Sequence, residues 1–169
     1  MNNPSLVKHI RDILILPFSV TVIIPYLIYD PLHVLVSNYI VPFKVFGMVC
    51  GTAGFFIFLY TVFLFRTLGK GTLAPWTPTQ KLVVAGPYRY CRNPMITGVF
   101  FILLGETFFL NSVELLQWAG LFFLINTTYF HLKEEPDLEK RFGDEYRIYK
   151  KNVPRWIPRI RPYEGNQST

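Results

Sequence analysis

The sequence predicts an all-α integral membrane protein with about four transmembrane helices, including a C-terminal helical hairpin, followed by an amphipathic cytoplasmic helix. Hydrophobic residues make up 51% of the 169 residues and aromatic residues 17%, more than a soluble domain usually carries. The excess lies in runs, and residues 45–65 form 21 positions without a charge. Because about 20 apolar residues cross a bilayer core as a helix, these runs predict membrane spans.

The first span is predicted over the apolar residues 13–29. Pro17 and Pro25 lie inside this run and should kink the helix, because proline lacks a backbone donor and clashes with the preceding turn. The run ends without a small-residue cleavage site. We therefore expect a retained span and not a signal peptide.

The second span is predicted over residues 45–65, and it contains closely spaced glycines. Gly47 and Gly51 stand four residues apart and Gly54 follows closely. This spacing allows two membrane helices to approach backbone to backbone. The alternative interpretation is a helix that merely contains small residues.

The third and fourth spans are predicted over residues 94–110 and 113–131. Only Asn111 and Ser112 separate them, and a connection this short predicts an antiparallel helical hairpin. Glu106 lies inside the third span. An acid within a membrane span is a candidate site residue, but this one approaches the outer end of its helix, so we interpret it as a structural partner.

The chain after Pro136 is predicted to form an amphipathic helix on or near the membrane surface. Apolar residues recur there at helical spacing among acidic and basic ones. The apolar positions are Leu138, Phe142, Tyr146 and Tyr149.

The placement of positive charge predicts the orientation in the membrane. A net charge of +6 on a soluble protein would indicate nucleic acid, but here the charge is distributed by segment. No Lys or Arg occurs over residues 12–42, whereas residues 66–93 carry five and no acid, and residues 131–161 carry nine. Since Lys and Arg accumulate in cytoplasmic loops, we predict a multi-pass protein with both termini cytoplasmic, a membrane lipid as partner and no nucleic acid.

The whole chain, residues 1–169, is predicted to be one membrane domain in four parts. They are two N-terminal spans (1–65), a cytoplasmic loop (66–93), a helical hairpin (94–131) and a cytoplasmic C-terminal segment (132–169). No metal is expected, because His131 has no second His or Cys at metal-ligand spacing.

Residues 86–98 mark the change from a basic loop to a membrane helix. The stretch opens with Gly-Pro, a turn signal, and Asn93 followed by Pro94 predicts a helix start in which the asparagine side chain caps the first turn. A helix start beside Arg89 and Arg92 can hold a carboxylate or a phosphate. The alternative is a capped helix whose arginines face lipid headgroups.

The end of the fourth span carries a polar face at the same predicted depth. Two neighbouring stripes of the helix descend towards the cytoplasm, so we predict a pocket between residues 86–98 and the end of this helix. The stripes are Asn126, Phe130 and Glu134, and Thr127, His131 and Glu135.

Two blocks of the sequence resemble the isoprenylcysteine carboxyl methyltransferase and phospholipid methyltransferase group of integral membrane enzymes. Together the blocks cover residues 69–158. The first contains Gly86-Pro87-Tyr88, Arg92-Asn93-Pro94 and Gly98, similar to that group's Gly-Pro-Tyr, Arg-His/Asn-Pro and following Gly. The second contains Glu134-Glu135, Leu138, Phe142-Gly143, Tyr146, Tyr149, Val153-Pro154 and Ile157-Pro158, similar in order and spacing to the C-terminal signature.

The resemblance implies S-adenosylmethionine as cofactor and methyl transfer to a lipid-soluble acceptor. Asn93 replaces the commoner histidine of the group, and asparagine can donate a hydrogen bond but cannot titrate. The cofactor-binding candidates by resemblance are Tyr88, Arg92, Asn93, Pro94, Gly98, Glu134 and Glu135, to which the polar stripe adds Asn126.

The acceptor stays open between two chemistries. A carboxylate acceptor, as in prenylcysteine, needs a cation, for which Arg155 or Arg147 could serve. An amine acceptor, as in phosphatidylethanolamine, needs a carboxylate to take its proton, for which Glu135 could serve. Glu135 and Arg155 are therefore the catalytic candidates.

Two tryptophans flank the predicted pocket in sequence and complete the substrate-binding candidates. Trp76 and Trp156 could contact a lipid-soluble acceptor, although tryptophan also favours the membrane interface for its own sake. We expect the acceptor to enter from the bilayer. The alternative function is a non-enzymatic small membrane protein whose arginines bind anionic lipid.

Overall fold

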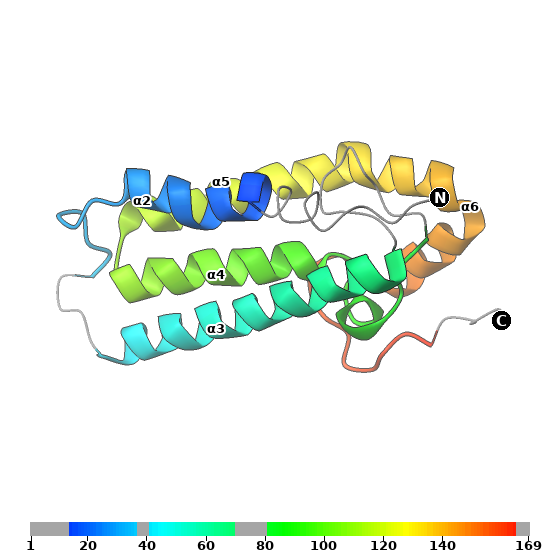
Figure 1. The fold of residues 1–169 in the computed structure, drawn as a ribbon, viewed down its shortest axis with the longest axis horizontal. Helices are drawn as coiled ribbons and strands as arrows, with labels where there is room; N and C mark the ends of the chain where they lie inside the picture. Colours follow the sequence, from blue (N-terminus) through cyan, green and yellow to red (C-terminus); the bar gives the residue numbers. More distant parts are fainter. Residues whose placement is uncertain (1–13, 37–40, 70–80, 165–169) are drawn as a thin grey trace.

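The computed structural model describes residues 14–36, 41–69 and 81–164, and every regular element in these ranges is a helix. One isolated bridge pairs Val34 with Ser112, and these ranges contain no strand. The all-α fold is therefore confirmed for this part of the chain. The elements are η1 (Leu14–Ile23), α2 (Ile24–Ile28), α3 (Val41–Leu64), η2 (Phe65–Gly69), η3 (Gly86–Arg89), α4 (Pro94–Leu110), α5 (Val113–Tyr129), η4 (Phe130–Glu134) and α6 (Glu135–Asn152), where η3 is a 3-10 helix and the other η elements are π-helical (Figure 1).

One helix of the described ranges is long and apolar enough to cross a membrane. It covers Val41–Gly69, which is α3 continued by η2, and it has 29 residues. Pro17–Ile28 and Pro94–Leu110 are apolar but shorter. At 1.5 Å per residue, the 17 residues of α4 extend roughly 25 Å, against about 30 Å for a bilayer core. The number of crossings therefore stays a prediction.

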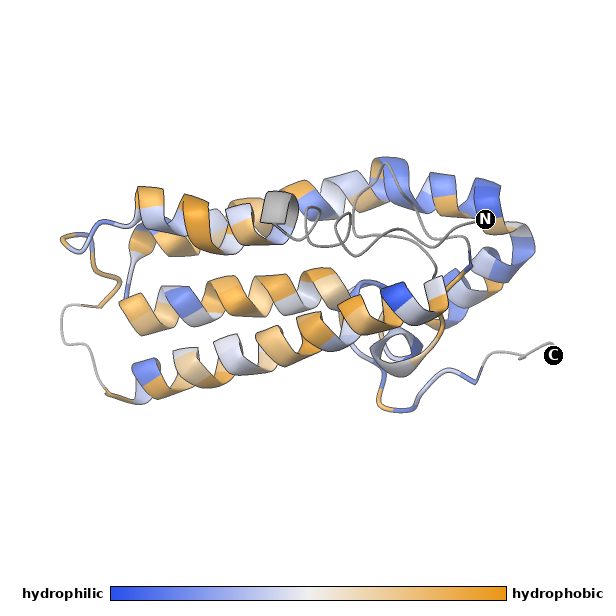
Figure 2. Cartoon of the chain, viewed as in Figure 1, coloured by the Kyte–Doolittle hydropathy of each residue, from blue (hydrophilic) through white to orange (hydrophobic). Residues whose placement is uncertain are grey.

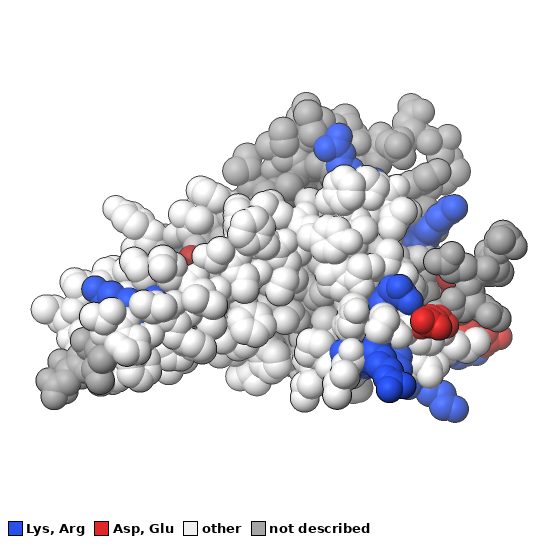
Figure 3. Space-filling model, turned by 90° about the horizontal axis from the view of Figure 1, so that it is seen from below, with Lys and Arg blue, Asp and Glu red and all other residues white. Residues whose placement is uncertain are grey.

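The helices lie along the long axis of the molecule, and the chemistry gathers at one end. The connections at residues 29–36 and 111–112 lie at one end, while η3, η4, α6 and residues 153–164 lie at the other (Figure 1). Hydrophobic residues dominate α3 and α4, and α6 is largely hydrophilic (Figure 2). Lys and Arg side chains gather near α6 on the face shown in Figure 3, and the middle of that face is uncharged.

Helices α3 and α4 contact each other through their glycines. A Cβ atom on Gly54 would lie 2.6 Å from the Gly98 carbonyl oxygen, and one on Gly47 would lie 2.8 Å from the Gly105 carbonyl oxygen. Such distances leave no room for a side chain. The predicted close packing of the second span is confirmed, and Gly98 belongs to this contact.

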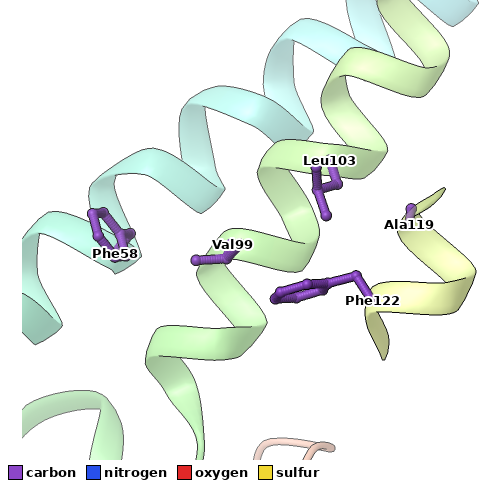
Figure 4. Packing of buried hydrophobic residues seen from close by; sticks show 5 residues of the cluster. All are labelled: Phe58, Val99, Leu103, Ala119 and Phe122. Atoms are coloured by element: carbon purple, nitrogen blue, oxygen red, sulfur yellow. The ribbon is translucent and has the colours of Figure 1, made fainter. Parts of the chain in front are cut away.

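A buried cluster joins α3, α4 and α5. Trp118 adds a link to the first element, because its Nε1 donates a hydrogen bond of 3.0 Å to the Val20 carbonyl oxygen. The packing holds α4 in the centre, with the start of this helix directed towards the charged end. The cluster consists of Phe58, Val99, Leu103, Ala119 and Phe122 (Figure 4).

Helix α6 differs from the predicted single amphipathic helix in two ways. It is broken at Gly143, whose φ of 56° and ψ of −129° are accessible to glycine and rare for other residues. Part of its apolar face also packs on the protein itself, and its position at a membrane surface stays a prediction. Tyr146 and Tyr149 are buried with Val153, and partly buried hydrophobic residues surround them: Leu82, Val84, Leu138, Phe142 and Tyr163.

Candidate functional site

The segment before α4 is held by the C-terminal segment, residues 153–163, through backbone hydrogen bonds. The Arg92 amide donates to the Pro154 carbonyl oxygen at 2.9 Å, and the Arg159 amide donates to the Tyr90 carbonyl oxygen at 3.0 Å. The Tyr149 hydroxyl donates to the Tyr88 carbonyl oxygen at 2.6 Å. The predicted cofactor loop is thus fixed by elements that follow it by more than sixty residues.

Helix α4 starts at Pro94 as predicted, but the predicted side-chain cap is wrong. The Asn93 side chain makes no capping hydrogen bond. The Asn93 carbonyl oxygen instead accepts from the Thr97 amide at 3.1 Å and from the Thr97 hydroxyl at 3.0 Å. The backbone at Asn93 has φ −122° and ψ 52°, outside the extended conformation usual for a cap residue. The side-chain amide of Asn93 is therefore not used as a cap, and the residue lines the cavity.

A cavity of about 670 Å³ lies beside this helix start, within the range of small-molecule sites. The part formed by α3, α4 and α5 is apolar, with Phe58, Val99 and Phe122 among its lining. The part formed by η4 and α6 is charged. Its charged lining residues are Lys133, Glu134, Asp137, Lys140 and Arg141, and Arg92 and Asn93 also line the cavity.

The two consecutive glutamates meet different surroundings, because neighbouring helical residues point about 100° apart. Glu134 lines the cavity. Burial raises the pKa of its carboxyl group, and the nearby Arg141 opposes that effect. Of the two glutamates, Glu134 is therefore the one that contacts the cavity.

Glu135 is 3% exposed and lies in a network of ion pairs. Its carboxylate is 2.8 Å from Arg92 Nη1, 2.7 Å from Arg155 Nη2 and 3.0 Å from Lys150 Nζ. Burial alone would raise its pKa, but the hydrogen bond from Lys150 and the charges of Arg92 and Arg155 hold the pKa below its ordinary value. Glu135 is therefore an anion with fixed partners.

The structure brings five predicted cofactor-binding residues to one cavity and leaves the others outside its lining. Gly98 packs on α3, and Pro94 is fully buried at the start of α4. The roles of all these residues stay predictions. Those that line the cavity are Tyr88, Arg92, Asn93, Asn126 and Glu134.

The predicted substrate-binding residues that the structure describes are not among the residues that line the cavity. Arg155 is paired with Glu135, and the exposed Arg147 is paired with Asp144 at 2.8 Å. The Trp156 ring contacts the aromatic rings of Phe123 and Phe130. Trp76 lies outside the described residues.

Sequence reasoning missed several residues that line the cavity. Helical period alone could not place them, because the π-helical turn η4 changes the register between α5 and α6. The signal in the sequence that could have indicated them is the cluster of charged residues directly after the apolar run 113–131. The missed residues are Tyr129, Lys133, Asp137, Lys140 and Arg141.

Among the described residues, no group of three or more His, Cys, Asp or Glu side chains could hold a metal ion. The buried Arg92 Nε, by contrast, has no hydrogen-bond partner among these residues. A buried donor without a partner is costly, so a ligand with an anionic group would satisfy it.

The fold and the cavity define a class: a helical protein with one apolar helix of membrane-spanning length among the described residues and a mainly apolar cavity that has charged lining residues from η4 and α6. The model of the phospholipid methyltransferase family matches residues 43–145, and the chain belongs to this family.

Three relatives are similar to parts of this chain. An uncharacterized protein of Haemophilus influenzae is 40% identical over 65 residues, which are 37% of this chain and 100% of that protein. The protein-S-isoprenylcysteine O-methyltransferases of Mus musculus and Rattus norvegicus are each 33% identical over 88 residues. These residues are 49% of this chain and 29% of each rodent enzyme, so the match spans less than a third of those enzymes.

Proposed function

We propose that the protein transfers a methyl group from S-adenosylmethionine to a lipid-soluble acceptor. The observation that carries this proposal is the divided cavity at the start of α4, in a chain of the phospholipid methyltransferase family. A charged part suits a polar, zwitterionic donor, and an apolar part suits the hydrocarbon of a lipid. The names of the rodent relatives, which are protein-S-isoprenylcysteine O-methyltransferases, support the same reaction class.

The residues of the charged part fit the cofactor. When bound, S-adenosylmethionine supplies a methyl group on a sulfonium centre. The Arg92 Nε, which has no partner among the described residues, and the side-chain amide of Asn93 would hold the cofactor's carboxylate, since both can donate hydrogen bonds. Glu134 would accept hydrogen bonds from its ammonium group or its ribose.

The apolar part of the cavity would orient the acceptor and exclude water from it. Alignment of the reacting groups and a dry site matter more for a displacement of this kind than strong acid or base catalysis. Phe58, Val99 and Phe122 supply this environment and carry no polar group.

The two glutamates bear on how an amine acceptor would lose its proton. Glu135, the base expected from the sequence, is held as an anion by three cations, and its lowered pKa makes it a weak base. Glu134 lines the cavity and has a raised pKa, so we propose Glu134 for this role. For a carboxylate acceptor, Lys133 or Lys140 at the cavity supplies the cation that Arg155 and Arg147 were expected to supply.

The proposed setting is a bilayer crossed four times, with the charged end in the cytoplasm. Exposed large hydrophobic residues along α3, among them Phe56 at 64% and Phe63 at 58%, favour contact with lipid. Helix α5 continues into η4, which lengthens this rod beyond the 17 residues of α5 itself. The donor would then enter from the cytoplasm and the acceptor from the bilayer.

Binding of radiolabelled S-adenosylmethionine to the detergent-purified protein tests the proposal. We expect saturable binding that Glu134→Gln weakens. Glu114→Gln is the control, because Glu114 pairs with His33 at the opposite end of the molecule. Absence of binding by a folded protein would contradict the proposal, and binding without methyl transfer to any lipid amine or prenyl carboxylate would contradict the reaction.

A further inference from the structure

A second cavity lies on the C-terminal segment and shares no lining residue with the first. It has a volume of about 420 Å³. Two arginines stand two residues apart in its wall. The lining residues are Asn152, Arg159, Arg161, Pro162, Tyr163 and Glu164.

Arg159 carries a buried donor without a partner. Its Nη1 atom has no hydrogen bond among the described residues, and neither Arg159 nor Arg161 forms an ion pair within the ranges that the structure describes. A buried guanidinium nitrogen normally finds an acceptor, because leaving it unpaired is costly. Glu164 lines the same cavity but forms no ion pair with either arginine, so an anion from outside these ranges would satisfy Arg159.

The wall of this cavity is fixed by hydrogen bonds to the loop before α4. The Arg159 amide donates to the Tyr90 carbonyl oxygen at 3.0 Å. Tyr163 is held twice by Arg89: its amide donates to the Arg89 carbonyl oxygen at 2.8 Å, and its carbonyl oxygen accepts from Arg89 Nε at 2.8 Å. The two arginines of the cavity are thus presented by a fixed backbone.

Apolar side chains alternate with these arginines and face outwards. Ile157 is 79% exposed and Ile160 is 98% exposed. Exposed isoleucine beside unpaired arginine is the composition of a segment that lies at a membrane interface, with apolar groups in the acyl boundary and cations at the phosphates. The segment lies at the end of the molecule where basic side chains gather (Figures 1 and 3).

We propose that residues 157–163 bind the phosphate of an anionic phospholipid. Arg159 and Arg161 donate to the phosphate oxygens, because guanidinium groups match the geometry of phosphate. Ile157 and Ile160 enter the acyl boundary beside it. The site is separate from the proposed methyl-transfer site, and it anchors the segment that holds the loop before α4.

Titration of the detergent-purified full chain with fluorescent phosphatidylglycerol tests this site. The double variant Arg159→Gln/Arg161→Gln should lose about tenfold or more in lipid affinity, because two charge-assisted contacts are removed. Ile157→Ser/Ile160→Ser should also weaken binding. The control Arg66→Gln/Lys81→Gln removes two exposed positive charges outside the C-terminal segment and should change affinity less than about twofold.

Three results would overturn the assignment. They are an equal loss in the control variant, unchanged affinity in the arginine variant, and displacement of the lipid by inorganic phosphate alone at millimolar concentration. Circular dichroism and thermal unfolding establish that each variant is folded. S-adenosylmethionine binding should persist in the arginine variant, so failure of this site and failure of the proposed function are distinguishable.

Discussion

The carboxylate of Glu135 connects three cations that come from three parts of the chain. Arg92 precedes α4, Lys150 lies in the second half of α6, and Arg155 lies in the C-terminal segment. The carboxylate is almost completely buried. Its removal would leave Arg92, whose side chain is 10% exposed, without its counterion. At the scale of one residue, this group stabilises the charged end of the molecule.

Glu135→Gln should lower the free energy of unfolding by about 3 kcal/mol, the lower end of what the loss of one partner of a buried ion pair costs. The matched variant is Glu134→Gln, which should leave stability nearly unchanged but weaken S-adenosylmethionine binding by roughly 1.5–3 kcal/mol. Thermal unfolding and radioligand binding measure the two effects. Equal unfolding midpoints for both variants would contradict this division of roles.

The stabilisation by Glu135 should depend on pH in acid. Because its folded pKa is lowered, its contribution is fully present above the unfolded pKa of about 4.3 and is lost as the pH falls through the folded value. The difference in unfolding midpoint between wild type and Glu135→Gln should therefore be constant near pH 7 and shrink below about pH 4. A difference that persists unchanged at pH 3 would argue against an ionic origin.

The Cys91 thiol should not react with water-soluble alkylating reagents in the folded protein. The residue is 4% exposed, and burial raises the pKa of its thiol to about 11. Cys50 is also buried, at 8% exposure. A water-soluble maleimide at pH 7.5 should label neither thiol until the protein is denatured, as mass spectrometry can measure. Rapid labelling of native protein at Cys91 would show that the segment before α4 opens.

Residue identities at the cavity could be predicted better than their contacts. Arg92, Asn93 and Glu134 followed from the motif and the polar stripe, and all three line the cavity. The ion pairs of Glu135 depend on the C-terminal segment, which bonds to the residues directly before α4. The spacing of residues within one helix does not reveal this contact. The Asn93 side chain does not cap α4, because the backbone of this residue has a ψ angle of 52° and not the extended conformation usual for a cap. The sequence does not reveal this backbone angle.

At the scale of elements, the contact between α3 and α4 makes Gly98 sensitive to substitution. A Cβ atom there would lie 2.9 Å from both the Gly54 carbonyl oxygen and the Phe58 amide nitrogen. Gly98→Ala should therefore destabilise the protein by about 1–3 kcal/mol. Gly120→Ala is the control, because nothing lies within 4 Å of the new atom and alanine favours helix by up to about 1 kcal/mol. Similar unfolding midpoints for the two variants would contradict a packing role.

Element types followed from the sequence, whereas their interruptions did not. Apolar runs predicted α3, α4 and α5, and the glycine spacing predicted where α3 meets its neighbour. The break at Gly143 and the π-helical turn η4 are deviations from a regular period. An analysis that assumes the α-helical period of about 3.6 residues throughout does not detect them. Both deviations lie in the part of the chain that contributes the charged lining of the cavity.

At the scale of the whole molecule, the charged end should face the cytoplasm. Asp144→Cys replaces a side chain that is 85% exposed at this end, and Leu32→Cys replaces a residue that is 83% exposed at the other. An impermeant maleimide added outside cells should label position 32 and not position 144, with little background because the native thiols are buried. Labelling at position 144 from outside would overturn the topology.

Membership of the all-α class could be predicted from composition and length of runs, but the number of crossings could not. The 17 residues of α4 fall short of a full span, and only the helix over Val41–Gly69 satisfies both length and composition among the described residues. Packing on α3 decides how α4 lies, and packing involves residues far apart in the chain.

The backbone bonds between the C-terminal segment and the loop before α4 also set an order of events during synthesis. Pro154, Arg155 and Arg159 leave the ribosome about sixty residues after their partners at positions 90–93. The apolar helices can insert and pack before the C-terminal segment has been synthesised. A nascent chain that stops at residue 152 would therefore have its helices but lack the segment that holds the loop before α4, so the candidate site is completed only after residue 159 has been synthesised.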